Sequence, residues 1–295
     1  MKTLDQLDLA GRRVLIRVDY NVPLDKSGDA SRITDDSRIR ASLPTLQCAV
    51  DAGAKVILAS HMGRPKGQVE ASSSLAPAAT RLAELLGRPV TLAVDCIGDE
   101  VEAQVGAMAD GDIVLLENLR FHPGEEKNDP AFAAALAKLA DIYVNDAFGT
   151  AHRAHASTVG VAGVLKERAA GLLLARELES LGALLGGAQR PFVAIIGGAK
   201  VSDKITVVEN LMERADAILI GGAMAYTFLR AQGIATGTSL VEEDKIELAR
   251  ATLAAAESKG VRLLLPTDHV IADAPKAGAA TEISGVAIRD GWLGV

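Results

Sequence analysis

Short apolar runs alternate with helical patterns along the whole 295-residue chain, and this alternation restricts its fold more than any other feature. In the first half the runs are rich in Val, Ile and Leu and are bounded by turn residues; they are 13–20, 55–60, 90–95, 112–118 and 141–146. Between them, 36–52 and 74–86 repeat apolar residues at helical spacing. Apolar strands separated by helices are typical of parallel sheets covered on both faces. We therefore expect an α/β fold with a doubly wound parallel sheet.

The chain is long enough for two domains, at about 100–200 residues for each. We expect a first domain over 1–166, a connecting amphipathic helix over 167–187 that ends in a Gly pair, and a second domain over 188–295. The second domain resumes the alternation of strands and helices, but it offers few strands for a covered sheet. We therefore expect this domain to be incomplete and the chain to be truncated.

Charge and composition exclude several classes of function. The formal net charge is −7, so the chain has no general attraction for nucleic acid or anionic membranes. No signal-peptide pattern opens the sequence, and no apolar run reaches the roughly 18 residues of a membrane helix, so we expect a cytoplasmic protein. The two cysteines, Cys48 and Cys96, lack the spacing of metal ligands, and we interpret both as ordinary thiols.

Basic side chains gather in the segments that follow the expected strands of the first domain. These segments are "SHMGRPKG" (60–67), "ENLRFHPGEEKND" (117–129) and "NDAFGTAHRAHAST" (145–158). They contribute Arg64, Arg120 and Arg153 to the strand ends, where parallel α/β sheets bind ligands. Arg38, at the start of a helix, can join them. Like charges repel unless an anion balances them, so the sequence predicts a site for a phosphorylated, carboxylate-bearing small molecule.

Zinc binding is an alternative interpretation of 145–158. His152 and His155 lie three residues apart, and His122 offers a third donor. No cysteine or carboxylate completes this set, and the adjacent Arg153 would repel a dication, so we assign no metal ligands. Nucleophilic catalysis is also disfavoured, because the sequence contains neither GxSxG nor a Cys/His pair in a plausible context.

Two Gly pairs follow expected strands of the second domain. "IIGGAKVSDKI" (195–205) places its Gly pair before a helix that we expect to begin around Val201, with Lys200 and Lys204 one turn apart. "ILIGGAMAYTF" (218–228) repeats this arrangement. Glycines let a backbone approach a ligand closely, and lysines at a helix start suit phosphate. Although neither a Walker A motif nor GxGxxG is present, two such turns side by side favour a flat slot for a nucleotide base.

Five stretches together resemble the motifs of phosphoglycerate kinase, in order and with that family's spacing over the whole chain. They are "RVDYNVP" (17–23), "SHMGRPKG", "LLENLRFHPGEEKND" (115–129), "NDAFGTAHRAHAST" and "GGAKVSDKI" (197–205). Tyr20 and Met62 are conservative departures. The resemblance implies two Rossmann-like domains that bend at a hinge around a cleft. It further implies a glycolytic, monomeric kinase that converts 1,3-bisphosphoglycerate and MgADP to 3-phosphoglycerate and MgATP, reversibly.

The resemblance also implies roles for individual residues. Those that would hold the triose phosphate are Asp19, Asn21, Arg38, His61, Arg64, Arg120 and Arg153, with His152 and His155 in or near the same basic patch. Those that would serve the nucleotide and its phosphates are Gly197, Gly198, Lys200, Lys204, Gly221, Gly222 and Gly294. Arg38 and Lys204 would be the catalytic pair that stabilises the transferring phosphoryl group. Mg²⁺ would arrive with ADP or ATP.

The family's motifs continue beyond the last residue of this sequence, through a segment that contacts the ribose and a turn that orders magnesium. We therefore expect little kinase activity from these 295 residues, and a coupled assay that forms ATP at about 1 per second or more would contradict this. A non-catalytic module that binds 3-phosphoglycerate through the first domain is the alternative. A dinucleotide-dependent oxidoreductase is disfavoured, because GxGxxG with a downstream acidic residue does not follow the first strand.

Overall fold

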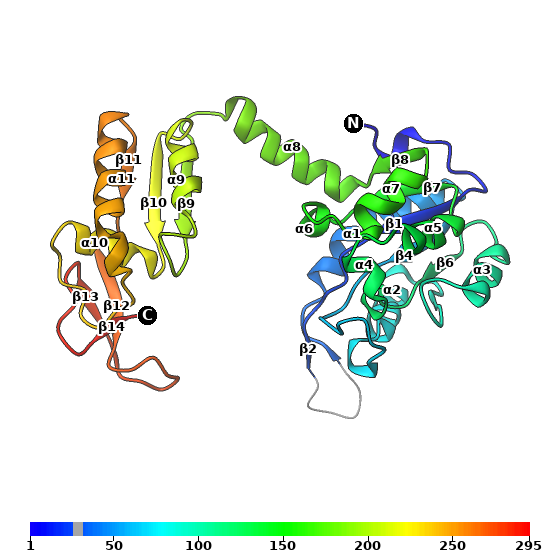
Figure 1. Ribbon diagram of the computed structural model, residues 1–295, viewed down its shortest axis with the longest axis horizontal. Helices are drawn as coiled ribbons and strands as arrows, with labels where there is room; N and C mark the ends of the chain where they lie inside the picture. Colours follow the sequence, from blue (N-terminus) through cyan, green and yellow to red (C-terminus); the bar gives the residue numbers. More distant parts are fainter. Residues whose placement is uncertain (26–31) are drawn as a thin grey trace. The chain divides into compact units, whose positions relative to one another are not determined.

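The computed structural model describes residues 1–25 and 32–295, which form two units, Met1–Leu181 and Gly182–Val295 (Figure 1). The boundary between them falls inside helix α8 (Leu172–Gly187). Among the helices of the described residues, none combines the length and apolarity needed to cross a membrane.

A six-stranded parallel sheet forms the centre of the first unit. In spatial order its strands are β5 (Thr91–Leu92), β6 (Ile113–Leu115), β4 (Lys55–Ala59), β1 (Arg13–Arg17), β7 (Ile142–Asn145) and β8 (Glu167–Ala170). Strand β1 pairs with β4 from Arg13↔Lys55 to Arg17↔Ala59, and on its other side with β7. Strands β2 (Leu24–Asp25) and β3 (Arg32–Ile33) form a separate antiparallel pair.

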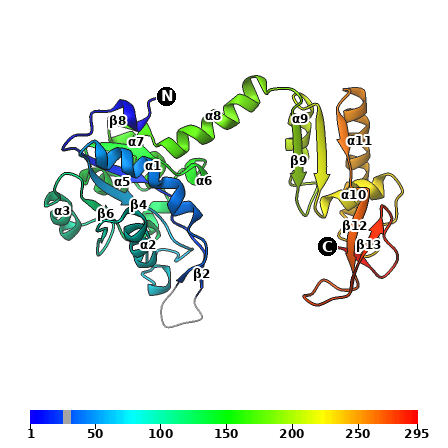
Figure 2. The same ribbon diagram turned by 180° about the vertical axis from the view of Figure 1, so that it is seen from behind.

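Helices cover both faces of this sheet, as its alternating strand residues require (Figures 1 and 2). Val14 and Ile16 join one core with α1 (Ser37–Asp51) and α2 (Ala76–Leu86). Leu15, which points to the other face, joins a second core. The helices of that second core are α3 (Asp99–Gly106), α5 (Pro130–Lys138) and α7 (Val161–Val164). The doubly wound parallel sheet expected for the first half is therefore confirmed.

Short helical turns fill the connections of the first unit. They are η1 (Leu4–Gln6), η2 (Ala71–Ser73), η3 (Leu119–Phe121), α4 (Pro123–Glu126), α6 (Phe148–Ala151) and the π-helix η4 (Ala156–Gly160). Four of them, η3, α4, α6 and η4, follow β6 or β7. They therefore carry the polar side chains that the sequence places beyond the strand ends.

The second unit contains two small sheets. The parallel sheet has the order β11 (Arg262–Leu264), β10 (Ala217–Gly221) and β9 (Val193–Gly197). Its core includes residues of α9 (Ile205–Met212), α10 (Met224–Ala231) and α11 (Ile246–Ser258), the last of which follows η5 (Glu243–Lys245). The antiparallel sheet has the order β13 (Thr281–Gly285), β12 (Asp268–Ala272) and β14 (Leu293–Gly294).

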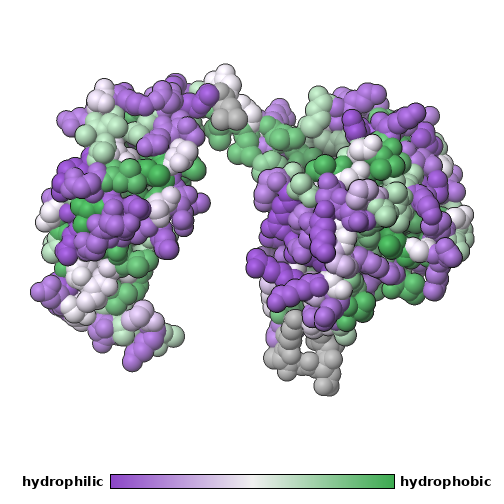
Figure 3. Space-filling model, viewed as in Figure 1, coloured by the Kyte–Doolittle hydropathy of each residue, from purple (hydrophilic) through white to green (hydrophobic). Residues whose placement is uncertain are grey.

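One face of the parallel sheet in the second unit is open to solvent. Within β9, Ala194 is 8% exposed and faces the core, whereas its neighbour Ile195 is 76% exposed. Val193 and, in β11, Leu264 are exposed as well. Figure 3 shows apolar patches that interrupt the polar surface of this unit. The sheet of the second unit is thus covered by helices on one face within the described residues.

The segment 167–187, which we expected to form a single helix, begins with a strand. Residues Glu167–Ala170 are strand β8, paired with β7 from Ile142↔Glu167 to Asn145↔Ala170, and the helix begins only at Leu172. The sequence "ERAA" favours a helix by intrinsic propensity. Pairing with an exposed strand edge overrides that weak preference, because it satisfies the backbone donors and acceptors of β7.

Two further expectations about the second unit are wrong. Helix α9 begins at Ile205 instead of Val201, so Lys204 is its N-cap residue and the residues before it form turns. The antiparallel strands β12, β13 and β14 were not expected at all. Strand β12 has exposed residues among its buried ones, and β13 is exposed along most of its length. These strands therefore lack the continuous apolar runs from which buried strands are recognised.

Candidate functional site

The carboxyl ends of β1, β4, β6 and β7 bring together four basic side chains. Arg17 is the last residue of β1, His61 follows β4, Arg120 lies in η3, and Arg153 follows α6. We call these four residues the basic edge. Burial, followed by the charges of Arg17, Arg120 and Arg153, lowers the pKa of His61 to about 2. The electrostatic coupling among them shows that the basic edge is one cluster.

Arg17 is the buried centre of the basic edge, with 1% of its surface exposed. Its Nε donates to Ser157 Oγ at 3.0 Å, and its Nη2 lies 3.1 Å from His61 Nδ1. Its Nη1 donates to the carbonyl oxygen of Val18. Burial lowers the pKa of Arg17, while the nearby carboxylate of Glu125 opposes this effect.

Glu125 is the buried carboxylate that balances Arg17. Its Oε2 accepts from the Ser157 backbone N–H at 2.9 Å, and its Oε1 accepts from Ser157 Oγ at 2.5 Å. Ser157 therefore joins Glu125 to Arg17 through one hydroxyl group. His155 Nδ1 lies 3.8 Å from Glu125 Oε1. Glu125 is the buried carboxylate among the three arginines, and the half-exposed Glu126 lies against Arg120. Two carboxylates against three guanidinium groups leave the basic edge with a net positive charge that an anion can neutralise.

The contact between Arg17 and His61 fixes the tautomer of the histidine. A guanidinium group has only donors, so His61 Nδ1 must be the acceptor. The ring is then neutral and carries its proton on Nε2. His61 can therefore donate one hydrogen bond without adding a fourth charge to the basic edge.

We predict that His61 stays neutral far below the pH at which histidines ordinarily titrate. Its folded pKa is about 2 against an ordinary 6.5, so the unfolded chain alone binds this proton between those values. Stability should fall as pH drops below 6.5, by about 2 kcal/mol at pH 5 from this residue. The C2-proton resonance of His61, assigned with His61→Gln, should not shift between pH 8 and 4. Titration of that resonance near pH 6 would contradict the prediction.

Asn118 ties together the loops that carry the basic edge. It is fully buried, and its Oδ1 accepts from the backbone N–H groups of Met62 at 3.2 Å and Arg120 at 3.0 Å. Its Nδ2 donates to the carbonyl oxygens of Met62 and Ser73, both at 2.8 Å. The segment after β4 and the segment after β6 are therefore fastened to one side chain.

Asn21 and Arg120 hold the same glycine in the loop after β4. Asn21 Oδ1 accepts from the Gly63 N–H at 2.9 Å, and Arg120 Nη1 donates to the Gly63 carbonyl oxygen at 2.8 Å. Arg120 Nε lies 3.2 Å from Glu126 Oε1 but outside hydrogen-bond geometry, so this group keeps donor capacity.

Asp19 connects Arg38 with the basic edge. Arg38 Nη1 lies 2.9 Å from Asp19 Oδ2, and Asp19 interacts electrostatically with Arg17. Arg64 and His152 are exposed and Arg153 is partly buried. Within the described part of the chain, the side chains of Arg64 and Arg153 have no hydrogen-bond or ion-pair partner. These two guanidinium groups are therefore free to bind a ligand.

The two Gly turns of the second unit lie side by side, as expected. Gly197 and Gly221 are paired in register at the ends of β9 and β10. Gly222 has φ +67°, and a Cβ there would lie 2.9 Å from the backbone N and O of Gly198. The aliphatic part of Lys204 lies over Gly198, while Lys200 is exposed. A side chain at Gly222 would separate the two turns, so the flat surface requires glycine.

A cavity of about 360 Å³ adjoins the second Gly turn. Its lining residues include Gly222, Tyr226, His269 and Gly294. A side chain at Gly294 would overlap the Tyr226 hydroxyl group. Of the predicted nucleotide-binding residues, the structure thus brings Gly222 and Gly294 to one cavity, and Gly221 directly precedes Gly222 in the chain.

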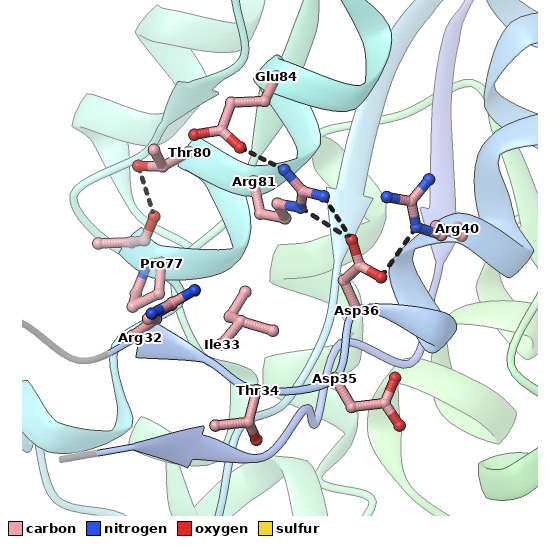
Figure 4. Close-up of a pocket in the computed structure, with 11 residues that line it drawn as sticks. Arg32, Ile33, Thr34, Asp35, Asp36, Arg40, Pro77, Thr80, Arg81 and Glu84 are labelled. Carbon is pink, nitrogen blue, oxygen red and sulfur yellow. Dashed lines mark hydrogen bonds and ion pairs between the residues drawn. The ribbon is translucent and has the colours of Figure 1, made fainter.

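A cavity of about 880 Å³ lies elsewhere in the first unit, between β3, α1 and α2. Figure 4 shows Arg81 bound to both Asp36 and Glu84, with Arg40 on the other oxygen of Asp36. Acids already neutralise these two arginines. The size of this cavity therefore does not make it the anion site, because its charges are largely balanced.

Comparison with known proteins decides the family. The sequence model of the family described as "Phosphoglycerate kinase" matches residues 4–295. The chain belongs to the phosphoglycerate kinase family. It is therefore a phosphotransferase, the class of enzyme that the sequence predicted.

Individual phosphoglycerate kinases agree with this family over nearly the whole chain. The protein from Anaeromyxobacter sp. (strain K) is 61% identical over 298 residues, which cover 100% of this chain and 74% of the relative. The protein from Acaryochloris marina is 59% identical over 293 residues, covering 99% and 72%. The solved phosphoglycerate kinase from Coxiella burnetii has a TM-score of 0.82 at 39% identity and covers 99% of this chain and 73% of that one.

The sequence did not identify four residues of the site, although they stand inside the quoted motifs. They are Arg17, Asn118, Glu125 and Ser157, which organise the basic edge from within. In sequence, Glu125 and Glu126 are indistinguishable neighbours. In the fold, the Glu125 side chain is 1% exposed and that of Glu126 is 51% exposed, so burial is the signal that separates them.

Proposed function

We propose that this protein catalyses reversible phosphoryl transfer from 1,3-bisphosphoglycerate to ADP, giving 3-phosphoglycerate and ATP. The observation that carries this proposal is the unbalanced basic edge, where Arg17, Arg120 and Arg153 face one buried carboxylate. Such a cluster suits a ligand with more than one negative charge. A phosphoglycerate offers a phosphate at one end and a carboxylate or acyl phosphate at the other.

The triose phosphate would bind the first unit. The free guanidinium groups of Arg64 and Arg153 and the partly engaged one of Arg120 would contact its phosphate. His61, Asn21 and Asp19 would supply neutral or accepting groups for the hydroxyl and the remaining oxygens. Support comes from the anchoring of Asn21 and Arg120 to Gly63 and from the neutral tautomer of His61.

The nucleotide would bind the second unit. Its base would lie against the Gly turns and in the cavity lined by Gly222, Tyr226 and Gly294. Lys204, the N-cap residue of α9, would contact the phosphates, with Lys200 nearby. Mg²⁺ would enter as part of the nucleotide substrate, and no residue of this chain is assigned to it.

The chemistry needs positive charge more than proton transfer. In the ATP-consuming direction the acceptor is a carboxylate, which is already ionised at pH 7, so no general base has to act. A neutral, arginine-bound His61 agrees with this. Arg38 and Lys204 would stabilise the charge on the transferring phosphoryl group.

Binding of 3-phosphoglycerate to the 295-residue chain tests the proposal. Arg153→Ala should weaken the affinity by about 10- to 100-fold, because it removes charge-assisted hydrogen bonds of about 1.5–3 kcal/mol. Arg81→Ala is the matched control, since Asp36 and Glu84 already neutralise that arginine. Isothermal titration calorimetry at two salt concentrations measures both effects. The proposed anion site would be refuted if Arg153→Ala and Arg81→Ala lost the same amount of affinity for 3-phosphoglycerate. Absence of saturable binding by the folded parent would also refute it.

A non-catalytic 3-phosphoglycerate-binding module remains the alternative, and turnover distinguishes it from the enzyme. The expectation that these 295 residues alone turn over slowly stays a prediction for the coupled ATP-forming assay. The cytoplasmic location and the monomeric state also stay predictions.

A further inference from the structure

Three metal-binding side chains meet at a second place in the first unit, outside the basic edge. Asp95 and Cys96 follow β5, and His122 follows η3. A carboxylate oxygen, the thiol sulfur and an imidazole nitrogen all lie within 4.8 Å of one another. His122 Nε2 lies 2.7 Å from Asp95 Oδ1. We call these three residues the Asp–Cys–His cluster.

We propose that the Asp–Cys–His cluster binds a borderline or soft divalent cation of the zinc type, with water completing four ligands. Around a tetrahedral zinc ion, bonds of about 2.0–2.3 Å place neighbouring ligand atoms about 3.3–3.8 Å apart. The donors of the cluster need to move by only about 1 Å to reach that geometry. In the bound state the ion replaces the direct contact between His122 and Asp95.

The composition of the cluster selects the kind of cation. Thiolate and imidazole ligands suit zinc and cobalt, whereas magnesium prefers an octahedral shell of oxygens. The site would therefore not compete for the Mg²⁺ that accompanies a nucleotide. Burial raises the pKa of the Cys96 thiol, so binding of the cation has to release the thiol proton to solvent. Arg17, Arg120 and Arg153 belong to the basic edge. The cluster itself contains no cationic side chain, and in the adjacent cavity Lys127 is accompanied by the carboxylate of Asp129.

The surroundings of the cluster provide both access and support. The side chains of Asp95 and His122 are 39% and 30% exposed, and His122 also lines a cavity of about 430 Å³. Cys96 is buried beneath them. The Cys96 N–H donates to Asp95 Oδ1 at 2.6 Å, and the Glu117 N–H donates to the Asp95 carbonyl oxygen at 3.3 Å. The His122 ring lies against Phe132, with ring centroids 5.3 Å apart.

The competing explanation is purely structural: Asp95 and His122 form a surface hydrogen bond, and Cys96 is a core thiol. Cys96 does contribute to the hydrophobic core of that face. The two explanations differ in one respect that can be measured, because only metal binding requires the sulfur atom. The chain supplies a matched control in Cys48, which lies in α1 and is its other cysteine.

Cobalt substitution tests the proposal on the intact, reduced protein. One equivalent of Co²⁺ should produce a thiolate-to-cobalt charge-transfer band in the near ultraviolet, and Zn²⁺ should abolish it. Cys48→Ser should keep the band, Cys96→Ser should lose it, and millimolar Mg²⁺ should leave it unchanged. His122→Gln should weaken Zn²⁺ binding by about tenfold or more, measured against a chromophoric chelator.

The proposal is overturned if the parent shows no band, or if Cys96→Ser retains the band of the parent. Thermal melts of each variant without metal establish that it is folded. If Cys96→Ser does not fold, His122→Gln and Asp95→Asn decide the matter, since Zn²⁺ affinity equal to that of the parent in both would refute the site. None of these measurements depends on kinase activity, so their outcome is independent of the proposed function.

Discussion

Replacing Arg38 by alanine in the full-length protein should lower kcat by about a thousandfold, a typical effect of removing an arginine that stabilises phosphoryl transfer. Arg38 Nη1 is held by Asp19 at 2.9 Å, and half of the side chain is exposed, so most of its donors are free for substrate. An ion pair of this exposure contributes about 0–1 kcal/mol to stability. The fold should therefore survive the change, and a coupled ATP-forming assay should report a loss confined to catalysis.

Arg40→Ala is the matched control for Arg38→Ala. Arg40 lies on the same helix, α1, and pairs with Asp36 at 2.9 Å, away from the basic edge. Its removal should change kcat less than twofold or so, as expected for an exposed helix pair. If Arg38→Ala keeps kcat within tenfold of the parent, or if Arg40→Ala loses as much, Arg38 has no catalytic role.

Replacing Glu125 by alanine should destabilise the first unit by about 3–5 kcal/mol, because it leaves the buried charge of Arg17 without its carboxylate. It also removes two acceptors from Ser157, whose backbone N–H and hydroxyl both point at Glu125. Glu125→Gln keeps an acceptor oxygen but loses the charge. Its free energy of unfolding should lie between that of the parent and that of Glu125→Ala. Urea denaturation followed by far-ultraviolet circular dichroism measures the difference.

The chain provides an internal way to assign that transition. Its single tryptophan, Trp292, belongs to the second unit, so fluorescence reports on that unit and the remaining dichroism change reports on the first. Glu126→Ala is the matched control, since its carboxylate is half exposed and should cost less than about 1 kcal/mol. Equal shifts for Glu125→Ala and Glu126→Ala would show that Glu125 does not balance Arg17.

The sequence predicted those parts of the fold that repeat a local pattern. Continuous apolar runs identified five of the six strands of the central sheet in the first unit. The loops after three of them supplied Arg64, Arg120 and Arg153. Strand β8 was not predicted, because "ERAA" contains no β-branched or aromatic residue and because its pairing depends on the neighbouring edge of β7. The antiparallel sheet of the second unit was not predicted either, because its strands have no continuous apolar run.

The interior of the candidate site could not be predicted, because burial is a property of the assembled fold. Arg17 stands inside an apolar run, where a charged residue gives no sign of whether it faces water or a buried carboxylate. Cys96 and His122 are far apart in sequence and match no ligand spacing. The two Gly turns were more predictable, since each glycine pair directly follows a strand and parallel neighbours bring such turns together.

The four hydrogen bonds of Asn118 have a thermodynamic consequence for the ligand. They fix the backbone on both sides of Met62 and at Arg120 before any ligand arrives, so binding has little chain entropy left to remove. For the proposed anion, preorganisation of this kind would leave more of the energy of its contacts with the arginines available as affinity. The same rigidity should give the amides of Met62 and Arg120 slow hydrogen exchange in the unliganded protein.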